Sequence, residues 1–263
     1  MHYRCDEDNG WMPDLEDIES KITENTHGLV IINPNNPPTG AVYSKEMVAK
    51  LVDIARRHDL VVFADEIYEK ILFDDAVHHH AAAAAGNDVL CLTFSGLSKA
   101  TGSAATAPAG SWCPAPRSSP RTSSRGLTLL SNMRMCANVP AQHAIQTALG
   151  GYQSINELIV PGGRFYEQAM LADRLLNEIP PGVTSVRPRG ALYCFPRLDP
   201  EVYPIDDDEQ FVIELLRAKK ILVTHGTGFN WFAPDHFRLV TLPDVDVLEE
   251  AIGRIAEFLA TRR

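Results

Sequence analysis

The chain has 263 residues, which is long enough for one large domain or for two of modest size. Hydrophobic residues make up 45% and aromatic residues 8%, as is typical of a soluble globular protein with a substantial core. The formal net charge of -10 argues against nucleic acid and acidic membrane surfaces as general partners.

The cysteines and the hydropathy pattern bear on the cellular compartment. Five cysteines are scattered without a CxxC pair, which favours reduced thiols over a disulfide framework or a zinc site. No apolar run approaches the length of a membrane span, and the first residues lack the apolar region of a signal peptide. We therefore predict a cytoplasmic protein with no membrane partner.

Strand and helix patterns alternate in the first half of the chain. Short apolar runs bounded by turn signals predict strands buried on both faces of a parallel sheet. Apolar residues at helical spacing predict helices between them, one of them with Ser44 as its N-cap. In chain order these are a helix over 14–22, a strand over 27–34, a helix over 44–57, and strands over 60–66 and 89–95. The alternation is typical of an α/β fold.

The second half combines long helices with shorter strands. Helices are predicted over 163–179, 209–220 and 246–259, and strands over 183–187, 190–195, 221–224 and 237–241. This texture predicts a smaller α+β domain over 161–263, after a first domain over 1–160.

A histidine tract interrupts the first half. His78, His79 and His80 are followed by five alanines. Such tracts can bind metal, but no pattern of cysteine or acidic ligands supports a site here. We predict a solvated loop and no metal site.

Polar residues follow three of the predicted strands, at the carboxyl ends where open α/β sheets place their working residues. They are Asn36, Asp65, Tyr68, Ser98 and Lys99. Taken singly, each has an ordinary explanation, such as a turn residue, a capping carboxylate or a solvated lysine. Their order along the chain is what makes them informative.

Four motifs occur in a familiar order: an Asn-Pro-rich turn ending in Pro-Thr-Gly, Ala-Asp-Glu-Ile-Tyr, Ser-Lys after a strand, and a late arginine in a strand. In these motifs the sequence resembles the class I/II pyridoxal-phosphate aminotransferases of fold type I. Stretches such as INPNNPPTGAVYSKE and FADEIYEKILFDD are most similar to the alanine (glutamate–pyruvate) aminotransferase branch. The resemblance implies the C-terminal part of a large domain, a mostly parallel sheet with helices on both faces, followed by a small α+β domain.

The resemblance also assigns roles. Lys99 matches the lysine that binds pyridoxal 5'-phosphate covalently and then moves the substrate proton. Asp65 matches the carboxylate beside the pyridine nitrogen, and Tyr68 and Asn36 match the groups near the ring oxygen. Arg238 matches the arginine that binds the substrate α-carboxylate, where a planar bidentate donor is suited.

Three assignments keep alternatives open. Ser98 either donates to the cofactor phosphate or caps its turn. Tyr193 either lines the substrate entrance or is a core aromatic residue. Asn230 is undecided in the same way, between a site residue and a structural residue. Asn36, by contrast, is expected to contact the substrate as well as the cofactor.

The implied function is transamination between an amino acid, alanine first, and a 2-oxo acid such as 2-oxoglutarate, in a homodimer. Aspartate as the amino acid, a β-lyase or decarboxylase reaction, and a non-catalytic remnant of the family are the alternatives. A transcription regulator on this fold would need a further DNA-binding domain.

Two departures from the family pattern lower the expected activity. Residues 100–125 contain no acidic, lysine or aliphatic residue other than alanine, and the expected phosphate-binding arginine falls at Ala107. We predict a segment that is disordered or read out of frame, since its unchanged spacing argues against a natural insertion. The chain also enters the family pattern partway through the large domain, without the glycine-containing phosphate loop. We therefore expect little or no transaminase activity from the chain as written.

Overall fold

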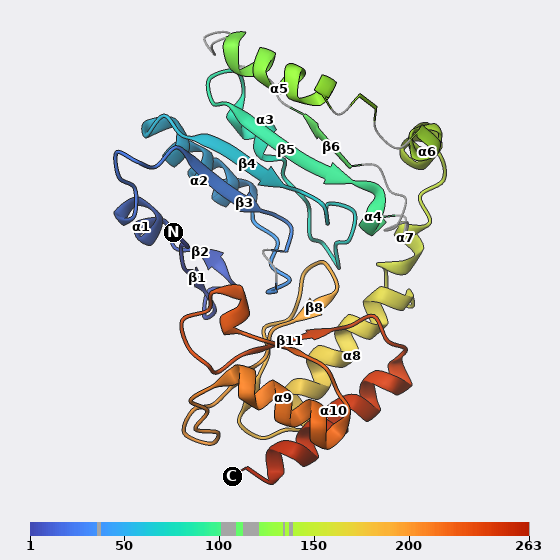
Figure 1. Cartoon of the computed structure of the whole chain (residues 1–263). Helices are drawn as coiled ribbons and strands as arrows, with labels where there is room; N and C mark the ends of the chain where they lie inside the picture. Colours follow the sequence, from blue (N-terminus) through green and yellow to red (C-terminus); the bar gives the residue numbers. More distant parts are fainter. Residues whose placement is uncertain (36–37, 101–108, 113–120, 134, 137–138, 263) are drawn as a thin grey trace.

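The computed structural model describes residues 1–35, 38–100, 109–112, 121–133, 135–136 and 139–262. Figure 1 shows a four-stranded sheet with its helices in the upper half and a group of long helices around short strands in the lower half. None of the described helices has the length and hydropathy needed to cross a membrane.

The upper sheet has the order β3 (Gly28–Ile32), β4 (Val61–Asp65), β5 (Cys91–Gly96) and β6 (Ala109–Trp112). The first three strands are parallel, and β6 is antiparallel to β5. The register sets Ile32 beside Asp65 and Asp65 beside Phe94, so the carboxyl ends of the three strands meet at one edge. The predicted α/β fold with a mostly parallel sheet is confirmed.

Helices cover one face of this sheet. The first half contains α1 (Leu15–Ser20), α2 (Lys45–Arg57) and α3 (Ala81–Ala85), and Figure 1 shows α2 and α3 behind the strands. Ser44 caps α2 as predicted, because its side chain accepts the N–H of Met47 at 3.1 Å. Leu51, fully buried, is among the α2 residues that pack into the core.

The opposite face of the sheet differs from the prediction. Leu29 and Ile31 are buried, but Val30 between them is 54% exposed, and Phe94 on the same face is 42% exposed. Successive residues of a strand point to opposite faces, and in the described part of the chain α2 and α3 cover only one of them. The prediction of strands buried on both faces is therefore wrong at Val30 of β3 and at Phe94 of β5.

The segment over 100–125 contains regular structure in two places. Strand β6 pairs with β5, and α5 (Arg121–Met133) begins before the segment ends. The hydrogen bonds between paired strands use backbone groups alone, so β5 can pair with a strand that contains no aliphatic residue larger than alanine. The expectation of disorder is wrong at these two places, whereas residues 101–108, with Ala107, and 113–120 lie outside the described residues.

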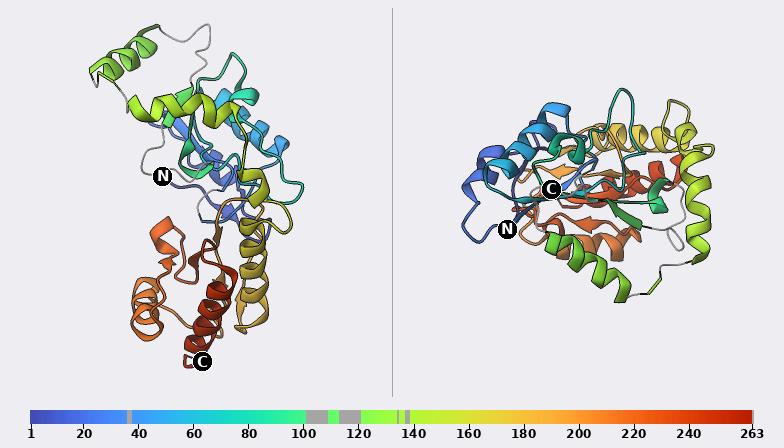
Figure 2. Two further views of the ribbon diagram at one scale, coloured as in Figure 1. Left: turned by 90° about the vertical axis from the view of Figure 1, so that its right-hand side faces the viewer. Right: turned by 90° about the horizontal axis from the view of Figure 1, so that it is seen from above.

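After α5 the chain descends through α6 (Val139–Gly150) and α7 (Ile155–Leu158) to the lower half (Figure 2). The helices there are α8 (Arg164–Glu178), α9 (Asp208–Lys219) and α10 (Val245–Ala260). The short strands are β7 (Val183–Thr184), β8 (Tyr193–Cys194), β9 (Arg197–Leu198), β10 (Thr224–His225) and β11 (Phe237–Val240), with the 3-10 turn η1 (Thr227–Phe229). β10, β11 and β8 form one antiparallel sheet, and β7 pairs with β9. The predicted strand over 221–224 begins only at Thr224, because two residues alone pair with β11.

Buried side chains form three clusters. One lies between the upper sheet and α2 and α3, and a second lies among α8, α9, α10 and the lower strands. The third joins the halves, since it contains Tyr68 and Phe73 from the upper half and Ile155 and Leu192 from further along the chain. Tyr68 and Phe73 follow β4 closely in the chain, so this third cluster includes the segment that leaves the carboxyl end of β4.

The N-terminal hairpin, β1 (Cys5–Asp6) and β2 (Met12–Pro13), is tied to the lower half by a buried histidine. His236 Nδ1 lies 2.7 Å from Asp235 Oδ1, and its Nε2 lies 3.4 Å from Glu7 Oε1. Burial lowers the pKa of His236, but the two carboxylates outweigh burial and raise that pKa above its ordinary value.

This pairing predicts how stability depends on pH. A raised pKa in the folded state means that the contribution of His236 is complete below about pH 6.5 and is lost as the pH rises through the raised pKa. The free energy of unfolding should therefore fall as the pH rises above about 6.5. We expect His236→Asn to remove the part of this fall that comes from His236, as measured by urea unfolding above pH 6.5. The same substitution at the exposed His58 is the control, and equal pH slopes in both variants would contradict the assignment.

Candidate functional site

Four of the predicted site residues form one connected group between the two halves. The hydroxyl oxygens of Tyr68 and Tyr193 lie 2.8 Å apart, which is a hydrogen bond. Lys99 Nζ lies 5.3 Å from the centre of the Tyr68 ring, and the Arg238 guanidinium lies 4.7 Å from the centre of the Tyr193 ring. The upper half supplies a lysine and a phenol, and the lower half supplies a phenol and an arginine.

Lys99 owes its place to the way β5 ends. The strand runs directly into α4 (Leu97–Ala100), so Lys99 projects at the carboxyl edge of the sheet, over the face of Tyr68. Ser98, half-buried, precedes it in the same turn, and its contact with a phosphate stays a prediction.

Asp65 is the last residue of β4, at the same edge. Its Oδ1 accepts the N–H of Ile67 at 3.1 Å, which fixes the turn that carries Tyr68. The bond uses one carboxylate oxygen, so the capping role and the role beside a ring nitrogen are compatible.

Both tyrosines keep their protons at neutral pH. Burial raises the pKa of Tyr68, and the hydrogen bond with Tyr193 offsets only part of that rise. Burial also raises the pKa of Tyr193, and the hydrogen bond with Tyr68 raises it further. Because Tyr193 donates to Tyr68, the hydroxyl of Tyr68 can donate one hydrogen bond to a ligand between the two halves.

Arg238 lies between two aromatic rings and has one buried N–H group without a hydrogen-bond partner among the described residues. Its guanidinium lies 4.7 Å from the ring centres of both Tyr193 and Phe229, and its Nη2 donates to Thr224 Oγ1 at 3.4 Å. Its Nε is buried and has no hydrogen-bond partner among the described residues. A buried guanidinium N–H without an acceptor is costly, which favours a bound carboxylate as its partner.

Two residues of this group were missed in the sequence. Phe229 covers one face of the Arg238 guanidinium, and Thr224 accepts its hydrogen bond. Thr224 and Arg238 lie in the predicted strands over 221–224 and 237–241, but only the structure shows that these strands pair and set the two residues directly opposite each other. Phe229 follows a glycine in a turn, and nothing in the sequence pattern indicates that its ring reaches the arginine.

Asn36, predicted to contact both cofactor and substrate, lies outside the described residues. The loop around it is built by two buried asparagines. Asn33 Oδ1 accepts the N–H of Tyr43 at 2.8 Å, and Asn35 Oδ1 accepts the N–H of Gly40 at 2.8 Å. The role of Asn36 stays a prediction.

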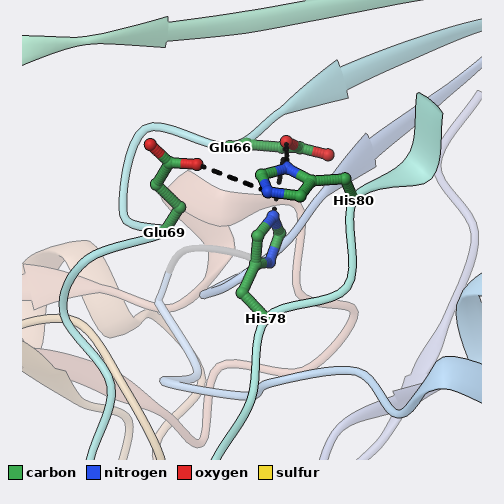
Figure 3. Close-up of side chains that lie close together, drawn as sticks. All are labelled: Glu66, Glu69, His78 and His80. Atoms are coloured by element: carbon green, nitrogen blue, oxygen red, sulfur yellow. Dashed lines mark hydrogen bonds and ion pairs between the residues drawn. The ribbon is translucent and has the colours of Figure 1, made fainter. Parts of the chain in front are cut away.

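The histidine tract is not the solvated loop that was predicted. The His78 side chain is only 6% exposed, and the alanines after His80 form α3. His78 and His80 lie beside Glu66 and Glu69, as Figure 3 shows. The acidic partners come from the turn after β4, which is too far away in the sequence for a local pattern to reveal them.

The sequence matches the family "Aminotransferase class I and II" over residues 1–255. This chain belongs to the class I and II aminotransferases. The resemblance found in the motifs is thereby confirmed.

Relatives of this aminotransferase chain carry alanine or pyruvate in their names. The alanine aminotransferase of Mycobacterium tuberculosis (strain ATCC 25618 / H37Rv) is 59% identical over 263 residues, covering 100% of this chain and 61% of that protein. The glutamate-pyruvate aminotransferase AlaA of Escherichia coli (strain K12) is 55% identical, covering 99% of this chain and 64% of that protein. The chain thus spans 61% to 64% of the length of these relatives.

Solved structures of aminotransferases have the same fold as this chain. An aminotransferase from Escherichia coli, 54% identical, superposes with a TM-score of 0.95 over 99% of this chain and 64% of that chain. An alanine aminotransferase from Pyrococcus furiosus, 32% identical, gives a TM-score of 0.89 over 99% of this chain and 64% of that chain. The fold of this aminotransferase chain is therefore the fold that its motifs imply.

Proposed function

We propose that the chain carries the reacting residues of a pyridoxal-phosphate-dependent aminotransferase that exchanges an amino group between alanine and 2-oxoglutarate. The connected group of Lys99, Tyr68, Tyr193 and Arg238 carries the proposal, because it combines an amine, two phenols and an anion-binding guanidinium. The names of relatives at 59% and 55% identity support the choice of alanine.

The residues fit the ring end of pyridoxal phosphate better than its phosphate. Lys99, Asp65 and Tyr68 meet at one edge of the sheet, where an amine, a carboxylate and a phenol could surround a pyridine ring. For the phosphate, Ser98 offers a hydroxyl, but Ala107 offers no donor at the position of the family's arginine. We therefore expect weak cofactor binding and low turnover.

When bound, the cofactor supplies an electron sink for the charge that develops at the substrate Cα. Lys99 Nζ would take the proton from the substrate Cα and deliver one to the cofactor carbon C4′, which is general acid–base work. Asp65 would keep the ring nitrogen protonated, since a carboxylate beside it favours the charged form. Tyr68 would donate a hydrogen bond to the ring oxygen, and Arg238 would orient the substrate by its carboxylate.

The test is an incubation of the chain with cofactor, alanine and 2-oxoglutarate. Transamination gives pyruvate and glutamate in equal amounts, whereas decarboxylation gives carbon dioxide. Low but equal formation of pyruvate and glutamate is the expected result. Carbon dioxide without glutamate would overturn the proposed reaction.

Tyr68→Phe tests the phenol in this site. The substitution removes the hydroxyl that bonds Tyr193 and would bond the ring oxygen, at a cost near that of one hydrogen bond, about 1 kcal/mol. We expect cofactor affinity to fall roughly 5- to 10-fold, measured by fluorescence titration. Tyr152→Phe, at an exposed tyrosine outside the group, is the control and should bind the cofactor as the unchanged chain does. Equal affinity in all three proteins would contradict the role of Tyr68.

We infer three further properties of this chain: its division into domains, its assembly with its ligands, and its location in the cell. Two domains over 1–160 and 161–263 are supported by the second cluster, whose buried members all lie between Ala172 and Leu259. A homodimer with alanine and a 2-oxo acid as ligands, and a cytoplasmic location, are supported by family membership. Gel filtration with light scattering tests the dimer.

A further inference from the structure

The strongest unassigned feature is the cluster of Glu66, Glu69, His78 and His80. One nitrogen or carboxylate oxygen from each residue lies within 4.8 Å of the others. Glu66 and Glu69 come from the turn after β4, and His78 and His80 come from the loop before α3 (Figure 3). None of the four belongs to the group proposed above for catalysis. We propose that they bind one zinc-class divalent cation.

The distances are close to those of a metal site. Zinc lies about 2.0–2.2 Å from nitrogen and oxygen ligands, so two ligands at a tetrahedral angle are about 3.3–3.5 Å apart. His78 Nε2 lies 3.3 Å from Glu66 Oε2, and His80 Nδ1 lies 2.6 Å from the same oxygen. The second distance is that of a hydrogen bond, and it lengthens to a ligand–ligand distance when the exposed His80 ring moves outward slightly.

The inner half of the site is already fixed. Glu66 is 3% exposed, and its Oε1 accepts the N–H of Ala81 at 3.0 Å. His78 is 6% exposed, and its Nε2 is buried without a hydrogen bond of good geometry. Its Nδ1 lies 3.5 Å from Asn33 Nδ2, a contact so long that Nδ1 can take the ring proton at little cost. Nε2 is then free to give its lone pair to a metal ion.

The outer half can adapt and gives access from solvent. His80 is 54% exposed and Glu69 is 24% exposed, so both can move by the fraction of an ångström that binding requires. When His80 Nδ1 gives its lone pair to an ion beside Glu66 Oε2, His80 Nε2 carries the ring proton and faces Glu69 Oε2 at 3.9 Å. A ligand histidine whose other nitrogen bonds a carboxylate is the usual arrangement around bound metals.

The donor set selects the kind of cation. Two imidazoles and the Glu66 carboxylate, with Glu69 beside the second nitrogen of His80, suit zinc and its neighbours in the first transition row, whereas magnesium and calcium prefer oxygen alone. The two carboxylates also match the charge of a divalent ion. A cation held here would join the turn that carries Asp65 and Tyr68 to the start of α3.

The test is a zinc titration of the chelator-stripped chain against a chromophoric competitor at neutral pH. We expect one zinc per chain at micromolar affinity or tighter, a zinc-dependent rise in melting temperature, and no displacement by magnesium. His80→Ala and Glu69→Gln should each weaken binding at least 10- to 100-fold. Both side chains are partly exposed, so these variants are expected to fold.

His79→Ala is the matched control, since His79 adjoins both ligands in sequence but lies outside the cluster. It should bind zinc as the unchanged chain does. Equal losses of zinc affinity in His79→Ala and His80→Ala, or an unchanged affinity in Glu69→Gln, would show that zinc binds to the run of histidines without a defined site. Either result would overturn the proposal. If a variant does not fold, X-ray absorption of the zinc-loaded unchanged chain decides. Two imidazoles with oxygen ligands support the site, and any other set overturns it.

Discussion

Lys99→Ala is expected to abolish the covalent attachment of pyridoxal phosphate and to lower turnover by about 10²- to 10⁴-fold, the range that a positioned acid–base group contributes. The reason is that alanine offers neither the nitrogen that binds the cofactor nor the amine that moves the Cα proton. Borohydride reduction followed by peptide mass spectrometry should find the cofactor on the peptide with Lys99, and on no single site in the variant.

Two controls separate chemistry from packing. Lys99→Arg keeps a cation over the Tyr68 ring, so it should preserve the melting temperature and still lose the covalent attachment. Lys70→Ala removes an exposed lysine of the same half and should leave the labelling at Lys99 unchanged. Cofactor found on several lysines equally, with no loss in Lys99→Ala, would contradict the assignment.

Arg238→Ala is expected to weaken substrate binding by roughly 100-fold, since charge-assisted hydrogen bonds contribute about 1.5–3 kcal/mol. The loss should appear in KM for alanine much more than in kcat, because the carboxylate is bound in the ground state and in the transition state alike. Binding of 2-aminoisobutyrate, which has a carboxylate but no Cα proton, measures the same loss without turnover.

Arg238→Lys distinguishes shape from charge. Lysine keeps the charge but loses the planar fork that lies between Tyr193 and Phe229, so an intermediate loss of about 10-fold is expected. Arg189→Ala, at an exposed arginine paired with Asp75, is the matched control and should bind the analogue normally. A KM unchanged in Arg238→Ala would contradict carboxylate binding at this residue.

Local patterns in the sequence predict most of the regular structure. Helix α2 begins after Ser44 because a serine before an amphipathic run satisfies an orphan N–H. Strands β3, β4 and β5 are apolar runs bounded by turn residues, and their parallel pairing follows from the helices between them. The motifs that place Asp65, Tyr68 and Lys99 at strand ends are equally local.

Contacts between distant segments determine the rest. Val30 is exposed because packing, not its own apolar character, decides which face of β3 is covered. His78 is buried because the turn after β4 brings Glu66 beside it, and Arg238 lies between two rings because β8 and η1 converge on β11.

The sequence by itself therefore determined the family, the α/β class and the candidates for the reacting residues, because each depends on residue type and short-range spacing. Only the tertiary structure decided the partners of those residues: the Tyr68–Tyr193 bond, the buried Nε of Arg238 and the cluster around Glu66. Each of these joins segments separated by many residues, and chain folding alone sets the distance between such segments.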